Sequence, residues 1–141
     1  MALEKGRNLF KKMSEPLVSK LEGVNPATLT WLTLPTGLAA AWLMMEAGTG
    51  QEGALMFVGA AFLMASAMAL DGLDGNLARA TGQVTRWGDY LDHTFDRLLD
   101  AVWIICISAS VFVNDIVLGL AAAWFTLLGS YMGTQAQAVA G

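Results

Sequence analysis

The chain carries little charge. Charged residues make up 14% of its 141 residues, whereas about a quarter is usual in soluble domains. Hydrophobic residues account for 55%, and the mean hydropathy is +0.52, which excludes an ordinary soluble domain. The single cysteine, Cys106, excludes an intrachain disulfide and is interpreted as a small buried apolar side chain. The net charge is −4, and we expect no nucleic-acid partner.

Long stretches carry no charge at all. Three uncharged runs, of 23, 18 and 14 residues, lie between residues 22 and 115, and the last 26 residues contain no charged side chain. A transmembrane helix needs about 20 apolar residues. The third run is short, so its helix must include the charged segment 92–100, whose polar groups should face the bundle interior. We therefore predict an all-α integral membrane protein, a transmembrane helix bundle with four spans near 27–47, 53–79, 87–113 and 116–136.

Basic residues are missing from two of the predicted connections, 46–52 and 114–115. Five of the eight basic residues precede the first predicted span, and the other three lie in or beside the segment between the second and third spans. Cytoplasmic segments of membrane proteins are enriched in Lys and Arg. We therefore expect a protein of the cell membrane whose N-terminus and aspartate-bearing end face the cytoplasm.

Residues 7–22 are predicted to form an amphipathic helix on the cytoplasmic membrane surface. The apolar side chains that share one face, at about 100° per residue, are Leu9, Phe10, Met13, Leu17 and Leu21. Such a helix suits an anionic leaflet, and an ordinary solvated leader is the alternative. The chain thus divides into a juxtamembrane segment, 1–24, and a transmembrane domain, 25–141, which begins at the N-cap pair Asn25-Pro26.

Four aspartates interrupt the apolar pattern at helical spacing: Asp71, Asp74, Asp92 and Asp96. An ionisable group inside a membrane costs about 2.5–3.5 kcal/mol on insertion scales and usually marks a functional site. On helices, the first two lie about 60° apart and the last two about 40° apart, so two neighbouring helices can direct all four at one volume. Four like charges repel one another unless a cation neutralises them, and hard divalent ions prefer oxygen ligands. Two metals about 4 Å apart would form a clamp for in-line displacement at phosphorus.

The residues around the first aspartate pair predict a ligand surface. Gly75 lies within a turn of both carboxylates. Glycine inside a helix costs about 1 kcal/mol relative to alanine, which makes sense where a ligand approaches the backbone. Ala78 extends this smooth face, and Arg79 offers bidentate hydrogen bonds to phosphate or serves as a snorkelling anchor. Three further residues have weaker assignments. Asp89 is expected to face solvent, and His93 is expected to be a packing or interface residue. Asp100 is expected to pair with Arg97 or to line the path of the acceptor.

These residues form a motif, D-x2-D-G-x2-A-R-x8-G-x3-D-x3-D, whose every fixed position is matched between Asp71 and Asp96. The chain in this respect resembles the CDP-alcohol phosphotransferases, integral membrane enzymes of phospholipid synthesis. The resemblance runs from about residue 15 to the C-terminus and implies a homodimer. Family members typically have six spans, so we expect a fragment or truncated sequence, with two further helices beyond Gly141.

The resemblance implies a role for each motif residue. Mg²⁺ or Mn²⁺, expected as two ions, would be held by Asp71, Asp74, Asp92 and Asp96. Asp96 would also be the general base for the acceptor hydroxyl. CDP would pack against Gly75, Ala78 and Arg79. The activated acceptor oxygen would attack the lipid-attached phosphate of a CDP-lipid, and CMP would leave.

The donor and the acceptor are less sharply defined. Residues 130–137, Ser-Tyr-Met-Gly-Thr-Gln-Ala-Gln, occupy the place of a Ser-Tyr-x-Lys-Ala-Arg-Ala-Glu pattern in related phosphatidylinositol phosphate synthases, whose basic residues hold the acceptor's phosphate. Gly133 and Gln135 replace those basic residues. The segment looks more like archaeal members, whose donor would be CDP-archaeol rather than CDP-diacylglycerol. Inositol phosphate or glycerol phosphate is the favoured acceptor, with serine or another alcohol as the alternative.

Two other functions also use aspartates within membranes. An ion or proton transporter would use the carboxylates as a relay, but it needs a polar path, and the first and fourth predicted spans offer few ionisable groups. An intramembrane prenyltransferase would also bind metal and pyrophosphate. Those enzymes carry a longer Asn-Asp-x-x-Asp-type motif and more spans, so phosphotransfer is the preferred hypothesis.

Overall fold

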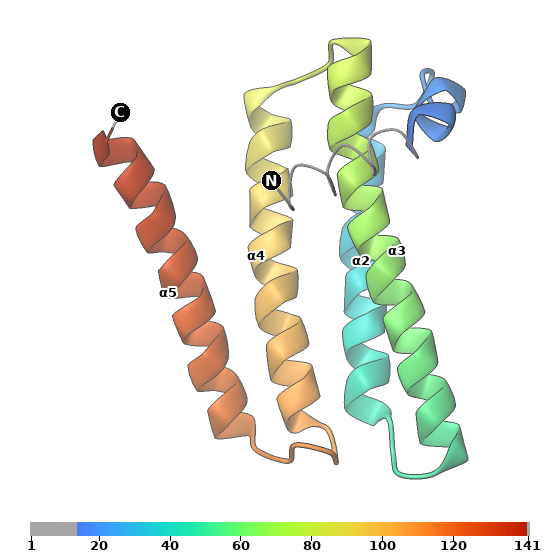
Figure 1. Cartoon of the computed structure of the whole chain (residues 1–141), viewed down its shortest axis with the longest axis vertical. Coiled ribbons are helices and arrows are strands. Elements are labelled where there is room, and N and C mark those ends of the chain that lie inside the picture. Colours follow the sequence, from blue (N-terminus) through green and yellow to red (C-terminus); the bar gives the residue numbers. More distant parts are fainter. Residues whose placement is uncertain (1–13, 141) are drawn as a thin grey trace, which may run out of the picture.

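The computed structural model of the chain describes residues 14–140. Four long helices make up most of them (Figure 1). They are α2 (Pro26–Glu46), α3 (Gln51–Thr81), α4 (Arg86–Ala109) and α5 (Ile116–Ala140). Residues 14–20 are also helical, and no strand occurs among residues 14–140. The all-α prediction is therefore confirmed. Of the predicted juxtamembrane helix, residues 7–13 lie outside the described residues.

The four helices lie side by side along the long axis, with α4 between α5 and the α2–α3 pair (Figure 1). The connections 47–50 and 110–115 are at one end of the bundle. The start of α2, the end of α3 and the start of α4 meet at the other end. The motif aspartates lie in the parts of α3 and α4 nearest to this second end, so three helices surround them.

Three of the helices, α2, α3 and α5, are long and apolar enough to cross a membrane, which supports an integral membrane bundle. The fourth predicted span, 87–113, corresponds to α4. Within the described chain α4 does not reach the same apolarity, because charged residues occupy its first half. Its buried residues Leu91, Phe95 and Leu99 recur every four positions, so α4 has one apolar and one polar face. That α4 crosses the membrane stays a prediction.

Local sequence fixes the helix ends near the aspartates. Asn25 Oδ1 accepts a hydrogen bond from a first-turn N–H of α2 at 3.0 Å, and Pro26 occupies that first turn, as predicted. α3 ends at Gly82, whose φ of +68° is left-handed and favours glycine. Thr85 caps α4, with its Oγ1 accepting from the Gly88 N–H at 3.0 Å. These caps position the turn that joins α3 to α4.

Small residues set the distances between helices. A Cβ at Gly37 of α2 would lie 2.6 Å from the Cδ atoms of Leu99 in α4, and the indole N–H of Trp103 donates to the Gly37 carbonyl at 2.8 Å. A Cβ at Gly119 of α5 would overlap Ser108 of α4. Such residues allow close helix packing in membranes. Because α2 packs on both α3 and α4 while α3 and α4 themselves approach less closely, side chains line a space between α3 and α4.

Candidate functional site

Three of the four predicted aspartates come together between α3 and α4. Asp71 and Asp74 of α3 and Asp92 of α4 each offer one carboxylate oxygen, and these oxygens all lie within 4.8 Å of one another. Asp74 is buried, with 4% of its surface exposed, whereas the other two are half-buried. Carboxylate oxygens are the donors that hard divalent cations prefer. This group of three, the carboxylate triad, is therefore suited to hold a divalent cation.

Asp96 is not part of the carboxylate triad. It lies one helical turn beyond Asp92 on α4 and lines, together with Asp71, a cavity of about 310 Å³. Arg97 and Asp100 line the same space, which we call the inner cavity. Asp96 therefore borders the triad on one side, and its roles as metal ligand and general base stay predictions.

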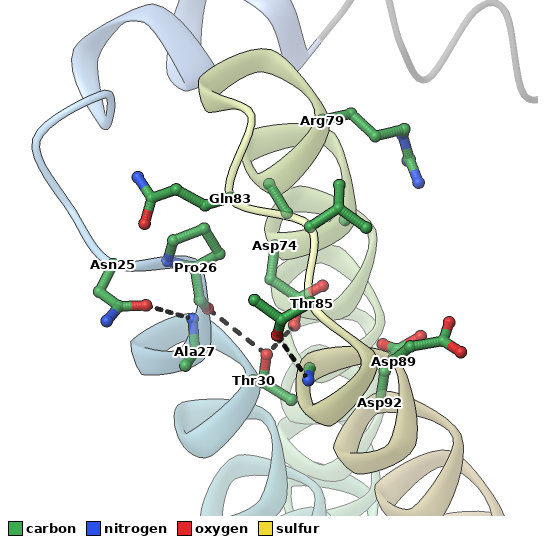
Figure 2. Close-up of a pocket in the computed structure, with 14 residues that line it drawn as sticks. Asn25, Pro26, Ala27, Thr30, Asp74, Arg79, Gln83, Thr85, Asp89 and Asp92 are labelled. Atoms are coloured by element: carbon green, nitrogen blue, oxygen red, sulfur yellow. Dashed lines mark hydrogen bonds between the residues drawn. The ribbon is translucent and has the colours of Figure 1, made fainter.

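A second space, the outer cavity, has a volume of about 340 Å³ and lies between the start of α2, the end of α3 and the turn before α4 (Figure 2). Asp74 and Asp92 line it. Its lining also includes all three residues predicted to contact CDP: Gly75, Ala78 and Arg79. Because Asp71 lines the inner cavity and Asp74 lines the outer one, the triad joins two compartments.

Arg79 lies at the rim of the outer cavity and its side chain is exposed. Its Nη2 donates to Asn76 Oδ1 at 2.9 Å, and Asn76 Nδ2 donates to Ser14 Oγ at 3.0 Å. A Cβ at Gly75 would lie 3.4 Å from both terminal nitrogens of Arg79, so the missing side chain leaves space beneath the guanidinium. Arg79 is thus oriented by Asn76, and this bond uses one of its five donors.

Two residues that were not predicted from the sequence contact the motif from outside its fixed positions. Thr30 of α2 donates a hydrogen bond from its hydroxyl to Asp74, which is 44 residues away. Asn76 occupies a variable position of the motif and bridges Arg79 to residue 14. In the sequence, Thr30 stands out as a threonine on an apolar helix, and Asn76 as an asparagine next to Gly75. Their contacts could not be predicted from this, because they depend on how the helices pack.

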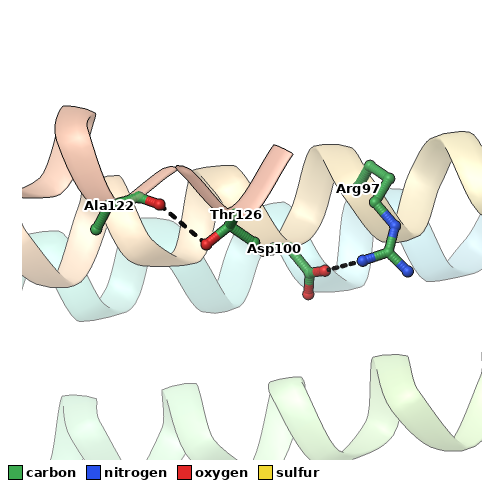
Figure 3. A network of polar contacts seen from close by, with 4 residues as sticks. All are labelled: Arg97, Asp100, Ala122 and Thr126. Atoms are coloured by element: carbon green, nitrogen blue, oxygen red, sulfur yellow. Dashed lines mark hydrogen bonds and ion pairs between the residues drawn. The ribbon is translucent and has the colours of Figure 1, made fainter. Parts of the chain in front are cut away.

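The weaker assignments have mixed outcomes. Asp100 pairs with Arg97, with 2.9 Å between Asp100 Oδ2 and Arg97 Nη1 (Figure 3), as one of the two interpretations predicted. His93 is exposed, with its Nε2 3.7 Å from Asp89 Oδ1, so a packing role within the described chain is wrong. An interface role for His93 stays a prediction. The Asp89 side chain is 71% exposed, which confirms that it faces solvent.

The segment that replaces the basic pattern of related synthases, residues 130–137, lies beside α4. Ser130, Tyr131 and Thr134 of α5 line a cavity of about 680 Å³ together with Arg86 and Arg97 of α4. Arg97 also lines the inner cavity. Arg97 is therefore shared between the α4–α5 cavity and the inner cavity, which Asp96 also lines.

Sequence comparisons with known proteins identify the family of the chain. The model of the CDP-alcohol phosphatidyltransferase family matches residues 23–138. An archaetidylinositol phosphate synthase of Pyrococcus horikoshii is 36% identical over 111 residues, which cover 78% of this chain and 52% of that protein. One from Methanothermobacter thermautotrophicus is 32% identical over 137 residues, covering 97% of this chain and 65% of that protein.

A bacterial relative aligns with a smaller part of this chain. A phosphatidylinositol phosphate synthase of Streptomyces avermitilis is 32% identical over 96 residues, covering 67% of this chain and 36% of that protein. The chain thus spans between one third and two thirds of the length of these three relatives. No solved structure matches. Since the family match includes α2, α3, α4 and nearly all of α5, the chain belongs to the CDP-alcohol phosphatidyltransferase family.

Proposed function

We propose that this chain forms the catalytic region of a membrane enzyme that transfers a phosphatidyl or archaetidyl group from a CDP-linked lipid to an alcohol, releasing CMP. The observation that carries the proposal is the carboxylate triad, which stands between two cavities inside the segment that matches the family. One cavity is available for the nucleotide and the other for the acceptor.

The donor set of the triad fits a hard divalent cation, and we assign Mg²⁺ or Mn²⁺ to it. Asp71, Asp74 and Asp92 would hold the cation, and Asp96 would complete a site for a second ion. A bound cation supplies charge neutralisation for the diphosphate and for the leaving CMP. Without a cation, three carboxylates within 4.8 Å would repel the anionic donor.

The outer cavity is the proposed CDP site. Gly75 and Ala78 keep the surface of α3 bare beside the triad, so the diphosphate can approach the backbone. Arg79, already oriented by Asn76, has further donors for phosphate oxygens. The cytidine would lie toward the turn at residues 83–85, which closes the cavity.

The inner cavity is the proposed place of the acceptor hydroxyl. Asp96 would take the hydroxyl proton as the acceptor oxygen forms its bond to the lipid-bearing phosphorus. The bond between that phosphorus and the CMP oxygen breaks in the same displacement, and CMP leaves with the electron pair. Among residues 14–140, only Asp96 and Asp100 provide carboxylates in this cavity besides the triad's Asp71, and Asp100 is engaged with Arg97.

We propose a polyol phosphate as acceptor, with inositol phosphate first and glycerol phosphate second. The two archaeal relatives are archaetidylinositol phosphate synthases, which supports inositol phosphate and a CDP-archaeol donor. Arg97 borders both the inner cavity and the α4–α5 cavity, so it can approach an anionic acceptor. We further propose a homodimer in the cell membrane with the outer cavity toward the cytoplasm, the side favoured by the basic residues.

The test is CMP release by the purified chain in lipid nanodiscs. CDP-archaeol and CDP-diacylglycerol are each offered with inositol phosphate, glycerol phosphate and serine, in Mg²⁺, Mn²⁺ or EDTA. We expect CMP and a new lipid in equal amounts with inositol phosphate, and none in EDTA. CMP release that persists in EDTA would contradict the proposed metal dependence. Release with serine alone would overturn the acceptor assignment while leaving the reaction class intact.

A further inference from the structure

We propose that Thr30 of α2 is a positioning residue that holds the buried Asp74 carboxylate in the orientation in which it joins the triad. The inference rests on the divalent-cation site proposed above. It concerns a residue outside the motif, on a helix that provides none of the four aspartates.

The contact between the two side chains is short and buried. Thr30 Oγ1 lies 2.5 Å from Asp74 Oδ2, a distance typical of a hydroxyl donating to a charged oxygen. Thr30 is 6% exposed and Asp74 is 4% exposed. Both line the outer cavity, where Figure 2 shows the hydrogen bond from α2 to α3.

Thr30 departs from the behaviour of its neighbours on α2. The hydroxyls of Thr33 and Thr36 donate to carbonyls of their own helix, those of Leu29 and Leu32, at 3.1 and 2.7 Å. Thr30 also has such a carbonyl within reach, Pro26 O at 3.4 Å. A hydroxyl carries one proton, and the much shorter contact assigns that proton to the carboxylate.

Asp74 needs this partner more than the other two triad members do. A buried carboxylate is costly unless it is hydrogen-bonded or paired, and Asp71 and Asp92 are only half-buried. A bond to Oδ2 leaves the carboxylate lone pairs that a cation can use, and it restricts rotation of the carboxylate. Partners of this kind orient metal ligands, and removing them typically costs about 10–100-fold in metal affinity.

The first turn of α2 is well defined, and it precedes the Thr30 hydroxyl by one turn. Asn25 caps the helix, and Pro26 restricts the backbone of its first turn. Thr30 follows one turn later, on the buried side of α2 that also includes Leu29 and Thr33. The N-cap thereby fixes where α2 begins and keeps Thr30 within regular helix, while the packing of α2 on α3 brings its hydroxyl to Asp74.

The test measures Mn²⁺ affinity of the whole 141-residue chain, without nucleotide or lipid substrate, from the electron paramagnetic resonance signal of free Mn²⁺. Thr30→Val removes the hydroxyl at nearly constant volume, and Thr30→Ser retains it. Thr33→Val is the matched control, because it removes an equally buried hydroxyl that donates within its own helix. Thr33 lines the inner cavity, and the measurement therefore contains no acceptor. Thermal unfolding of each variant confirms that it is folded, and Thr30→Ala replaces Thr30→Val if the latter is not.

We expect Thr30→Val to bind Mn²⁺ about 10–100-fold more weakly, with Thr30→Ser and Thr33→Val close to wild type. The rate of CMP release by Thr30→Val should recover as Mn²⁺ is raised, since the metal concentration for half-maximal rate changes more than kcat. Wild-type Mn²⁺ affinity in Thr30→Val, or an equal loss in Thr33→Val, would overturn the inference. If wild type and variants show the expected Mn²⁺ affinities but no CMP forms, the inference holds and the proposed reaction fails.

Discussion

The contact between Gly37 of α2 and Leu99 of α4 gives a prediction about how the site is held together. Gly37→Ala places a methyl group 2.6 Å from two Leu99 carbons, where about 3.5–4.0 Å is the usual separation. Overpacking of this kind costs about 1–3 kcal/mol. Leu99 is 3% exposed, so it cannot turn away without disturbing other side chains. Displacement of α4 would also move Asp92 relative to the rest of the triad.

The control is Gly129→Ala in α5, because nothing lies within 4 Å of a Cβ at that position. Both substitutions add one methyl group, and both replace glycine by alanine inside a helix, which should stabilise the helix by about 1 kcal/mol. The unfolding free energies should therefore differ by about 1–3 kcal/mol, with Gly37→Ala the less stable. Unfolding by SDS in mixed micelles, followed by tryptophan fluorescence, measures both values.

A double-mutant cycle with Leu99→Ala isolates the contact. Truncation of Leu99 removes both carbons that the new methyl would meet, so Gly37→Ala should no longer destabilise the protein in that background. If Gly37→Ala instead stabilises the wild-type chain as much as Gly129→Ala does, the helices are not held at this distance and the reasoning is refuted.

Three predictions concern the cavities. Arg79→Lys should raise the KM for the CDP-lipid with little change in kcat, because lysine lacks the bidentate donors; steady-state kinetics test this, and a loss in kcat alone would contradict it. Asp96→Asn should lower kcat by about 10²–10⁴-fold, the usual range for a general base, while CDP still binds in calorimetry; unchanged kcat would exclude this role. Gly75→Val should weaken CDP binding with Mn²⁺ affinity retained, and tight CDP binding by this variant would place the nucleotide elsewhere.

Much of the helical arrangement follows from composition and end signals. The uncharged runs predicted spans at 27–47 and 53–79, where α2 and α3 occur. The predicted helix at 87–113 ends earlier, at Ala109, because the backbone at Ser110 is extended and the Ser110 hydroxyl donates to the Ile107 carbonyl at 2.6 Å. A polar serine in an apolar run gave little signal for this stop.

The site was predictable where it depends on spacing within one helix and not where it depends on packing between helices. Helical spacing places Asp71 and Asp74 on one face of α3, and the motif identified Asp92 as their partner, as observed. The same reasoning grouped Asp96 with them, but one turn of helix advances about 5.4 Å, which puts Asp96 at the inner cavity. The bond from Thr30 to Asp74 depends on the register of α2 against α3, which no local pattern specifies.

The most direct test of the proposed function compares CMP release by Asp71→Asn with that by Asp115→Asn. Asp71 belongs to the triad. Asp115 is the last residue of the connection before α5, where its Oδ1 accepts the Leu118 N–H at 2.9 Å, and asparagine can make the same cap. With CDP-archaeol, inositol phosphate and Mg²⁺, we predict background release from Asp71→Asn and wild-type release from Asp115→Asn. Wild-type release from a folded Asp71→Asn chain would contradict catalysis at the triad.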